Sequence, residues 1–288
     1  MDVKRRSIFE LIKLVKMSRK DIDITKAKNQ FKKDSRIKEC FHFDNKSCSD
    51  NVISAHSIQR SGVLDLLEHE VNGNNCIYSF LHLKLNHNGF PEGFEPLGKK
   101  SASTFFGFCS YHDNNIFIPI ENHPINIEDD EHCFLLSYRA FAKDHHAKYE
   151  TLQGYKTNEF YQEEAKPEIT EGLINGSELG FRDGNLVKSR LNEMLKDQIY
   201  DGLEYFTYTL DYTIPLALSA SITPEYSYKN DILNLSNDPD IFYEYVNFVI
   251  HPTSNQTHIL FSCLREHSKS IKFINQLNEL NPLKLEKA

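Results

Sequence analysis

The chain has no long apolar run, few cysteines for its length and no overall excess of positive charge. No window of about eighteen apolar residues occurs, so the sequence predicts no membrane-spanning helix. Six cysteines among 288 residues are too few for a disulfide scaffold, and we expect core thiols or metal ligands in a cytoplasmic protein. The formal net charge of −8 excludes a uniformly basic nucleic-acid coat protein.

Several motifs are also missing. The sequence contains no G-x-x-x-x-G-K-(S/T) loop and no G-x-G-x-x-G fingerprint, so nucleotide-driven chemistry has no support in its motifs. It has no G-x-S-x-G elbow, which argues against the common serine-hydrolase scheme. The chain begins with MDVKRRSIFELIKLVK, in which charges interrupt the apolar positions and no small-residue cleavage site follows. We therefore expect no secretory signal peptide.

The positive charge is concentrated at the N-terminus. Residues 1–39 hold 13 Lys or Arg against 6 Asp or Glu, a net charge of +7, and the remaining chain carries −15. Residues 7–17 have apolar side chains at helical spacing, and the polar side carries Lys13, Lys16, Arg19 and Lys20. We interpret residues 1–39 as a basic helix and linker that is either solvated or in contact with nucleic acid.

The sequence from residue 40 onward predicts an α+β protein in two parts. Residues 40–125 consist of short segments separated by Gly, Asn and His, typical of a small module that a bound metal helps to hold together. NCIYSFLHLKL (75–85) is expected to form a buried strand pair. Residues 126–288 are predicted to be a helical connector followed by an antiparallel sheet with helices. The expected helices are 128–165, 185–200 and 268–280, and the expected strands are 204–212, 214–222, 241–250 and 257–267.

Four residues have the spacing of a zinc site. Cys109 and His112 form a C-x2-H knuckle, whose two ligands reach one tetrahedral ion from a single tight turn. Cys40 and Cys48 form a wider C-x7-C pair around a polar, turn-prone loop. We predict a structural zinc site of the treble-clef type, with buried core thiols as the alternative. Cys76, Cys133 and Cys263 lie in apolar segments and are expected to be core residues.

Between the two cysteine pairs lies VISAHSIQR (52–60), which places His56 at the end of a predicted strand. A strand-end histidine can act as a general base toward water, and Asp113, directly after the knuckle, can hold a divalent ion such as Mg²⁺ or Mn²⁺. Arg60, Lys99 and Lys100 are candidates for phosphate contacts. The alternatives are that His56 is a zinc ligand or a core residue, that Asp113 complements a helix dipole, and that the lysines serve only solubility.

The segments CFHFDNKSCSDNVISAHSIQRSG, SASTFFGFCSYHDNNIFIPIE and FLLSYRAFAKD resemble a family of bacterial proteins that contain an HNH-like or treble-clef zinc domain. The resemblance covers roughly residues 36–145. It implies a zinc-stabilised module, and some HNH-like proteins of this kind belong to phage-defence loci. In the HNH design the strand histidine activates water, and acids on the following helix hold the catalytic ion.

Two hypotheses follow. The first is a metal-dependent HNH-like endonuclease, in which zinc folds the module and a second divalent ion serves the chemistry. The second is a non-catalytic zinc module that binds nucleic acid or a protein partner. It rests on Ala55, which stands where the usual Asp-His pair has its aspartate, and on the acidic bulk of residues 40–288. The predicted C-terminal sheet offers an edge for a protein partner.

Overall fold

The structure is a computed structural model that describes residues 24–49, 51–85, 91–236 and 238–279. The predicted basic helix at 7–17 lies outside these residues. The chain divides into two compact units, one of residues 1–37 and 148–179, and one of residues 38–147 and 180–288. Two long helices, α6 (Asp130–Thr157) and α7 (Pro167–Asp197), contribute residues to both units.

The first unit has an aromatic core. Helix α2 (Ile24–Asp34) carries Phe31, whose ring centroid lies 5.8 Å from that of Tyr155 and 5.8 Å from that of Tyr161 in the helical turn η3 (Phe160–Glu164). Gly154 of α6 allows this approach, because a Cβ at that position would lie 2.3 Å from the Phe31 ring. Residues 24–34, which belong to the predicted linker, therefore form a packed helix.

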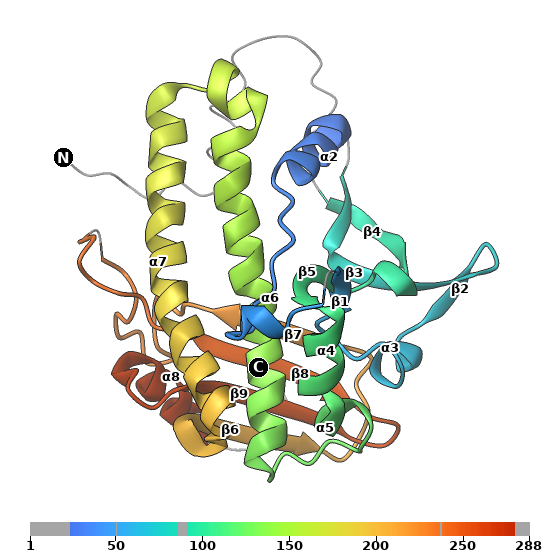
Figure 1. Ribbon diagram of the computed structural model, residues 1–288. Coiled ribbons are helices and arrows are strands. Elements are labelled where there is room, and N and C mark those ends of the chain that lie inside the picture. Colours follow the sequence, from blue (N-terminus) through green and yellow to red (C-terminus); the bar gives the residue numbers. More distant parts are fainter. Residues whose placement is uncertain (1–23, 50, 86–90, 237, 280–288) are drawn as a thin grey trace. The chain divides into compact units, whose positions relative to one another are not determined.

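The second unit contains a four-stranded antiparallel sheet in the order β6-β9-β8-β7 (Figure 1). Its strands are β6 (Leu203–Leu210), β7 (Leu218–Ile222), β8 (Val246–Pro252) and β9 (Thr257–Leu264), and the turn η4 (Tyr200–Gly202) precedes β6. Leu203, Val249 and Leu260 join the core that includes α6 and α7 residues, whereas Phe206 and Phe261 pack with helix α8 (Ser268–Asn278). The alternating sequence therefore provides two apolar faces for one sheet.

A second antiparallel pair carries the candidate site. Strand β1 (Val52–His56) pairs with β5 (Thr104–Cys109), and β5 leads directly into α4 (Ser110–Ile116) and α5 (Ile118–Glu121). Phe105, Phe108 and Phe117 belong to the same buried cluster as Phe134 and Tyr138 of α6. The predicted small module therefore shares one continuous hydrophobic core with the helices and the sheet that follow it in the chain.

The chain between β1 and β5 forms a three-stranded sheet in the order β2-β3-β4, which connects to β1 through α3 (Val63–Leu66) and to β5 through the turn η2 (Lys99–Ser101). Its strands are β2 (His69–Val71), β3 (Asn74–Leu85) and β4 (Pro91–Gly98). The expected buried strand pair over 75–85 is wrong. Strand β3 runs unbroken, and its Phe80 is 71% exposed against Phe94, with ring centroids 5.1 Å apart.

The α+β class with antiparallel sheets and helices is confirmed, but some predicted bounds are wrong. Helix α7 begins at Pro167 rather than at 185. The sequence pattern misses its first half, because Gly172, Gly176 and Gly180 lower the intrinsic helix propensity there. The strand expected from 241 begins at Val246. The backbone N–H of Tyr243 instead donates to the Asp183 carboxylate at 3.0 Å. No described helix is long and apolar enough to cross a membrane.

Candidate metal centre and adjacent polar cluster

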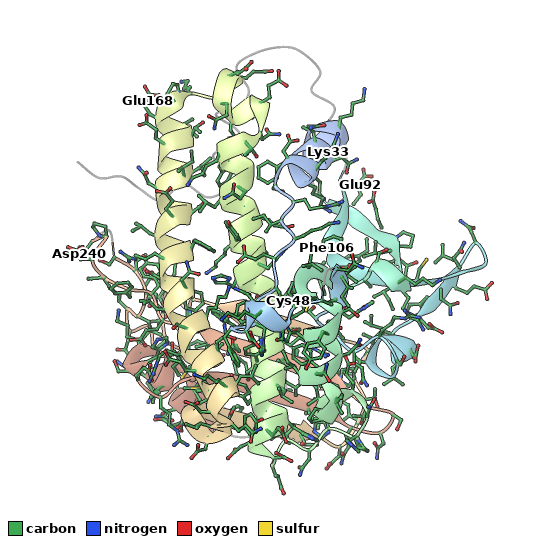
Figure 2. All side chains as sticks on the ribbon, in the orientation of Figure 1. Lys33, Cys48, Glu92, Phe106, Glu168 and Asp240 are labelled. Atoms are coloured by element: carbon green, nitrogen blue, oxygen red, sulfur yellow. The ribbon has the colours of Figure 1, made fainter. Side chains whose placement is uncertain are left out.

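Two segments supply four metal-ligating side chains to one point. The zinc loop, residues 40–48, enters β1 and includes the turn η1 (Asn45–Ser47), with Cys40 and Cys48 at its ends; Figure 2 labels Cys48. Cys109 ends β5 and caps α4, and His112 lies in the first turn of that helix. The Sγ atoms of the three cysteines and a ring nitrogen of His112 all lie within 4.8 Å of one another. This cluster could hold a metal ion.

The distances fit a tetrahedral zinc ion. The Nδ1 atom of His112 lies 3.4 Å from Cys40 Sγ, 3.6 Å from Cys48 Sγ and 3.2 Å from Cys109 Sγ. Zinc bonds of about 2.3 Å to sulfur and about 2.0 Å to nitrogen at tetrahedral angles separate the two ligand atoms by roughly 3.5 Å. Three soft thiolates and one imidazole are a donor set that favours zinc over Mg²⁺ or Ca²⁺.

The other ring nitrogen of His112 is also engaged. Its Nε2 lies 3.0 Å from Ser47 Oγ, and Ser47 Oγ itself donates to the Asp44 carbonyl at 3.2 Å. A histidine that binds a metal through one nitrogen usually donates the other N–H to an acceptor, which fixes its tautomer and its orientation. Ser47 therefore holds His112 with Nδ1 directed at the three sulfur atoms. His42 stacks on the same ring, with centroids 3.8 Å apart.

Backbone amides stabilise the sulfur atoms. The Cys109 N–H donates to Cys40 Sγ, and the His112 N–H donates to Cys109 Sγ, each at 3.4 Å. Burial raises the pKa of Cys109, but hydrogen bonds from the His112 and Ser49 backbones outweigh it and lower that pKa to about 7. Burial and the neighbouring thiols raise the pKa of Cys48 to about 12. Cys76, Cys133 and Cys263 are buried away from this cluster, as expected for core thiols.

His56 lies outside the cluster, at the opposite end of β1 from Val52, which pairs with the ligand Cys109. Burial lowers the pKa of His56, a hydrogen bond to the Lys99 backbone raises it, and the positive charges of Arg60 and Arg139 lower it further. The ring is therefore neutral near pH 7. Its Nε2 is buried and has no hydrogen-bond partner among the described residues.

Asp113 shares two charged neighbours with His56. Burial raises its pKa, whereas Arg139 lowers it and Glu121 raises it; the pKa of His56 responds to the same arginine and glutamate. Its Oδ1 is buried and, among the described residues, has no hydrogen-bond partner. Arg139 of α6 is only 3% exposed, pairs with Glu121 at 2.6 Å and lies with Cζ 3.8 Å from the centroid of the Phe117 ring. A strand histidine and a helix carboxylate thus flank one arginine–glutamate pair.

The candidate phosphate-contacting residues differ in their surroundings. Lys99 forms ion pairs with Asp65 and with Glu68, the latter at 2.6 Å, so its charge is already compensated. Lys100 and Arg60 are exposed. Lys13, Lys16, Arg19 and Lys20 lie outside the described residues.

Sequence patterns alone did not single out Arg139 or Ser47 as site residues. Arg139 is the single charge within the apolar run FLLSYRAF. A charge on an apolar helix face is rarely buried without a partner, and this position could have indicated a site residue. Ser47 had no signal, because its role depends on which nitrogen of His112 faces the cysteines.

Comparisons with models of protein families, with curated proteins and with solved structures found no match to this chain.

Proposed function

We propose that this chain is a metal-dependent nuclease of the HNH-like type, in which zinc stabilises the fold and a second, hard divalent ion takes part in phosphodiester hydrolysis. The observation that carries the proposal is a pair of buried atoms, His56 Nε2 and Asp113 Oδ1, which have no hydrogen-bond partner in the described part of the chain and whose groups both respond to the charges of Arg139 and Glu121. Buried polar atoms without partners are rare and indicate a function or an absent ligand.

The order of elements supports a treble-clef assignment. Two ligands precede the β1–β5 pair, and the other two belong to the first turn of the helix that follows it. This order places the strand histidine and the helix carboxylate on the same three elements that surround the zinc ligands. The β2–β4 sheet is then an insertion between the two strands of the pair.

His56 has the properties of a general base. It is neutral near pH 7 because burial and two nearby cations disfavour the imidazolium. The hydrogen bond to the Lys99 backbone holds the ring and leaves Nε2 to accept a proton from an attacking water.

Asp113 supplies one carboxylate for a hard cation, and its unpartnered Oδ1 fits such a role. Mg²⁺ is commonly bound by one or two carboxylates together with substrate phosphates and water. When bound, the ion would stabilise negative charge on the phosphate oxygens. Arg139, held by Glu121, adds a fixed positive charge close to the same carboxylate. Exposed Arg60 can bind a phosphate on the strand that enters the site.

A second candidate is a zinc-stabilised module that binds nucleic acid or protein without catalysis. Ala55 favours it, because this buried position holds no carboxylate beside His56. Arg139 favours it too, because its positive charge already acts on the Asp113 carboxylate and would repel a second cation there. The phage-defence role implied by the family resemblance stays a prediction under either function.

The test is cleavage by the purified, zinc-loaded full chain. Supercoiled plasmid, single-stranded DNA and RNA are each incubated with Mg²⁺ or Mn²⁺. His56→Ala and Asp113→Ala should each lower the cleavage rate by at least about a hundredfold, the usual contribution of a positioned acid or base. Both variants should keep the zinc content and the melting temperature of the parent.

His69→Ala and Cys133→Ser are the controls. His69 is exposed on β2, and Cys133 is a buried thiol of α6, so neither should change the rate per folded molecule. Cleavage at the parent rate by His56→Ala, or the absence of cleavage with every divalent ion, would overturn the nuclease proposal in favour of the binding module.

A further inference from the structure

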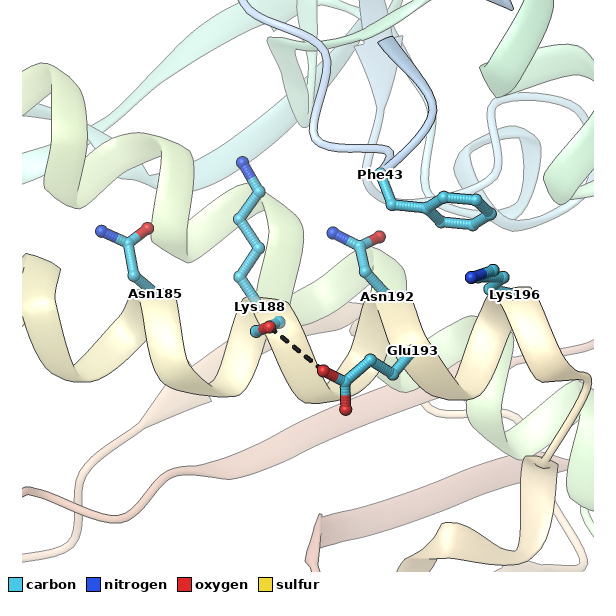
Figure 3. Close-up of a pocket in the computed structure, with 7 residues that line it drawn as sticks. Phe43, Asn185, Lys188, Asn192, Glu193 and Lys196 are labelled. Atoms are coloured by element: carbon cyan, nitrogen blue, oxygen red, sulfur yellow. Dashed lines mark hydrogen bonds between the residues drawn. The ribbon is translucent and has the colours of Figure 1, made fainter.

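A hollow lined mostly by residues of polar and charged types lies between the zinc loop and the C-terminal half of α7 (Figure 3). It has a volume of 430 Å³, within the range of about 300–1,000 Å³ typical of small-ligand sites. Phe43 of the zinc loop forms one wall, and Lys188, Asn192 and Lys196 of α7 form the other. None of the candidate nuclease residues lines it.

The hollow carries unbalanced positive charge. Within the described chain, neither Lys188 nor Lys196 takes part in an ion pair, although both side chains line the hollow. The acid in the lining, Glu193, is bound by Arg190 at 2.8 Å, so its charge is compensated from outside. Glu39 acts on Lys188 from a distance, without an ion pair. The two lysines of this wall provide positive charge for an anion such as a phosphate group.

The position of Lys188 is fixed by its surroundings. Its Nζ lies 5.0 Å from the centroid of the Phe41 ring, and the side chain is partly buried. Asn192 beside it is buried, accepts a hydrogen bond from the Tyr138 hydroxyl at 2.7 Å and donates to the Phe41 carbonyl at 3.1 Å. The lysine therefore extends from a rigid wall, so that little conformational freedom is lost when an anion binds.

The opposite wall is aromatic. The Phe43 ring is 41% exposed, and it packs against His42 with ring centroids 4.1 Å apart. His42 in turn stacks on the metal ligand His112, so the ring is held by the zinc loop. An exposed aromatic ring and lysines that line the same hollow are the combination that binds a nucleobase together with its phosphate.

We propose that this hollow binds a nucleotide, with its phosphate on the lysine-bearing wall of α7 and its base stacked on Phe43. The same chemistry is offered by a free nucleotide and by the phosphorylated end of a nucleic-acid strand. The site is separate from His56 and Asp113, so the proposal does not depend on nuclease activity.

The test is calorimetric titration of the zinc-loaded full chain. The probes are AMP, adenosine, inorganic phosphate and a short single-stranded oligonucleotide with and without a 5′-phosphate. We expect AMP or the 5′-phosphorylated oligonucleotide to bind, and adenosine and the unphosphorylated oligonucleotide to bind at least tenfold more weakly. Binding of AMP identifies a free nucleotide, whereas binding of the phosphorylated oligonucleotide alone identifies a strand end.

Lys196→Gln and Phe43→Ala should each weaken that binding at least fivefold, and both side chains are exposed. Lys46→Gln is the matched control, because Lys46 is an exposed lysine of the zinc loop that does not line the hollow. His56→Ala should bind as the parent does, which separates this site from the proposed nuclease. The proposal is overturned if no probe binds at millimolar concentration, or if Lys46→Gln weakens binding as much as Lys196→Gln.

Discussion

Ser47 Oγ lies 3.0 Å from His112 Nε2, on the side of the imidazole ring opposite the three cysteine sulfur atoms. The hydroxyl accepts the N–H at Nε2 and leaves the Nδ1 lone pair free for a metal. The serine therefore decides the tautomer of a candidate metal ligand without itself belonging to the cluster. Partners of this kind commonly contribute tenfold to a hundredfold to the metal affinity of a site.

Ser47→Ala should weaken zinc binding by about tenfold, since the ring loses the acceptor that orients it. The zinc dissociation constant is measured by competition with a chromophoric chelator. Asn45→Ala, an exposed change within the same turn, should keep the parent affinity. Equal affinities for Ser47→Ala and the parent would mean that the three cysteines alone fix the ring.

Removal of a ligand should lower metal content and stability together. We expect Cys109→Ser to bind less zinc and to melt at a lower temperature, because Cys109 joins β5 to α4 as well as to the metal. A strong chelator should lower the melting temperature of the parent toward that of Cys109→Ser and change the variant little. Cys133→Ser provides the contrast, with lower stability and unchanged zinc content, since Cys133 is a buried core residue.

The pH dependence of cleavage should follow His56. A general base must be unprotonated, and burial lowers the pKa of this histidine below its ordinary value of 6.5. The midpoint of the acid limb of the cleavage rate should therefore lie below pH 6.5. Arg60→Gln removes a positive charge that disfavours the imidazolium, so the decline should begin at a higher pH. A midpoint above pH 6.5 in the parent would exclude His56 as the titrating base.

Acid should destabilise the sheet through His251. Burial lowers the pKa of this histidine to about 4, and the nearby charges of His258 and Arg139 add to the effect. Between pH 6.5 and 4 the unfolded chain binds a proton that the folded chain excludes, so stability falls as the pH falls through this window. A difference of about 2.5 pKa units corresponds to a loss of about 3 kcal/mol across the window.

The measurement is urea unfolding at pH 7 and at pH 5. Between these two pH values the free energy of unfolding should fall by about 2 kcal/mol less in His251→Leu than in the parent. His123→Gln, a change of an exposed histidine, should keep the parent difference. The same acid sensitivity in His251→Leu and in the parent would assign the effect to other groups.

The local half of the metal centre could be predicted from the sequence. Cys109 and His112 are three residues apart, so one strand end and one helical turn bring them together whatever the surrounding fold does. The alternation of apolar residues likewise indicated the strands of the C-terminal sheet, because a period of two is a local property. The bounds of α7 escaped prediction, since its glycines oppose a helix that is stabilised by packing.

Contacts between distant segments were decided by tertiary structure alone. Cys40 and Cys48 reach Cys109 because β1 pairs with β5 across the inserted β2–β4 sheet, and no local spacing determines that pairing. The same pairing places His56 at the end of β1 away from the metal cluster, while α6 brings Arg139 to Glu121, where its charge acts on His56 and Asp113. Lys99, a candidate for phosphate contact by sequence, pairs with Asp65 and Glu68. The sequence by itself thus determined which side chains can bind a metal or a proton. The tertiary structure decided the partners of these side chains, because burial and charge pairing depend on segments that are far apart in the chain.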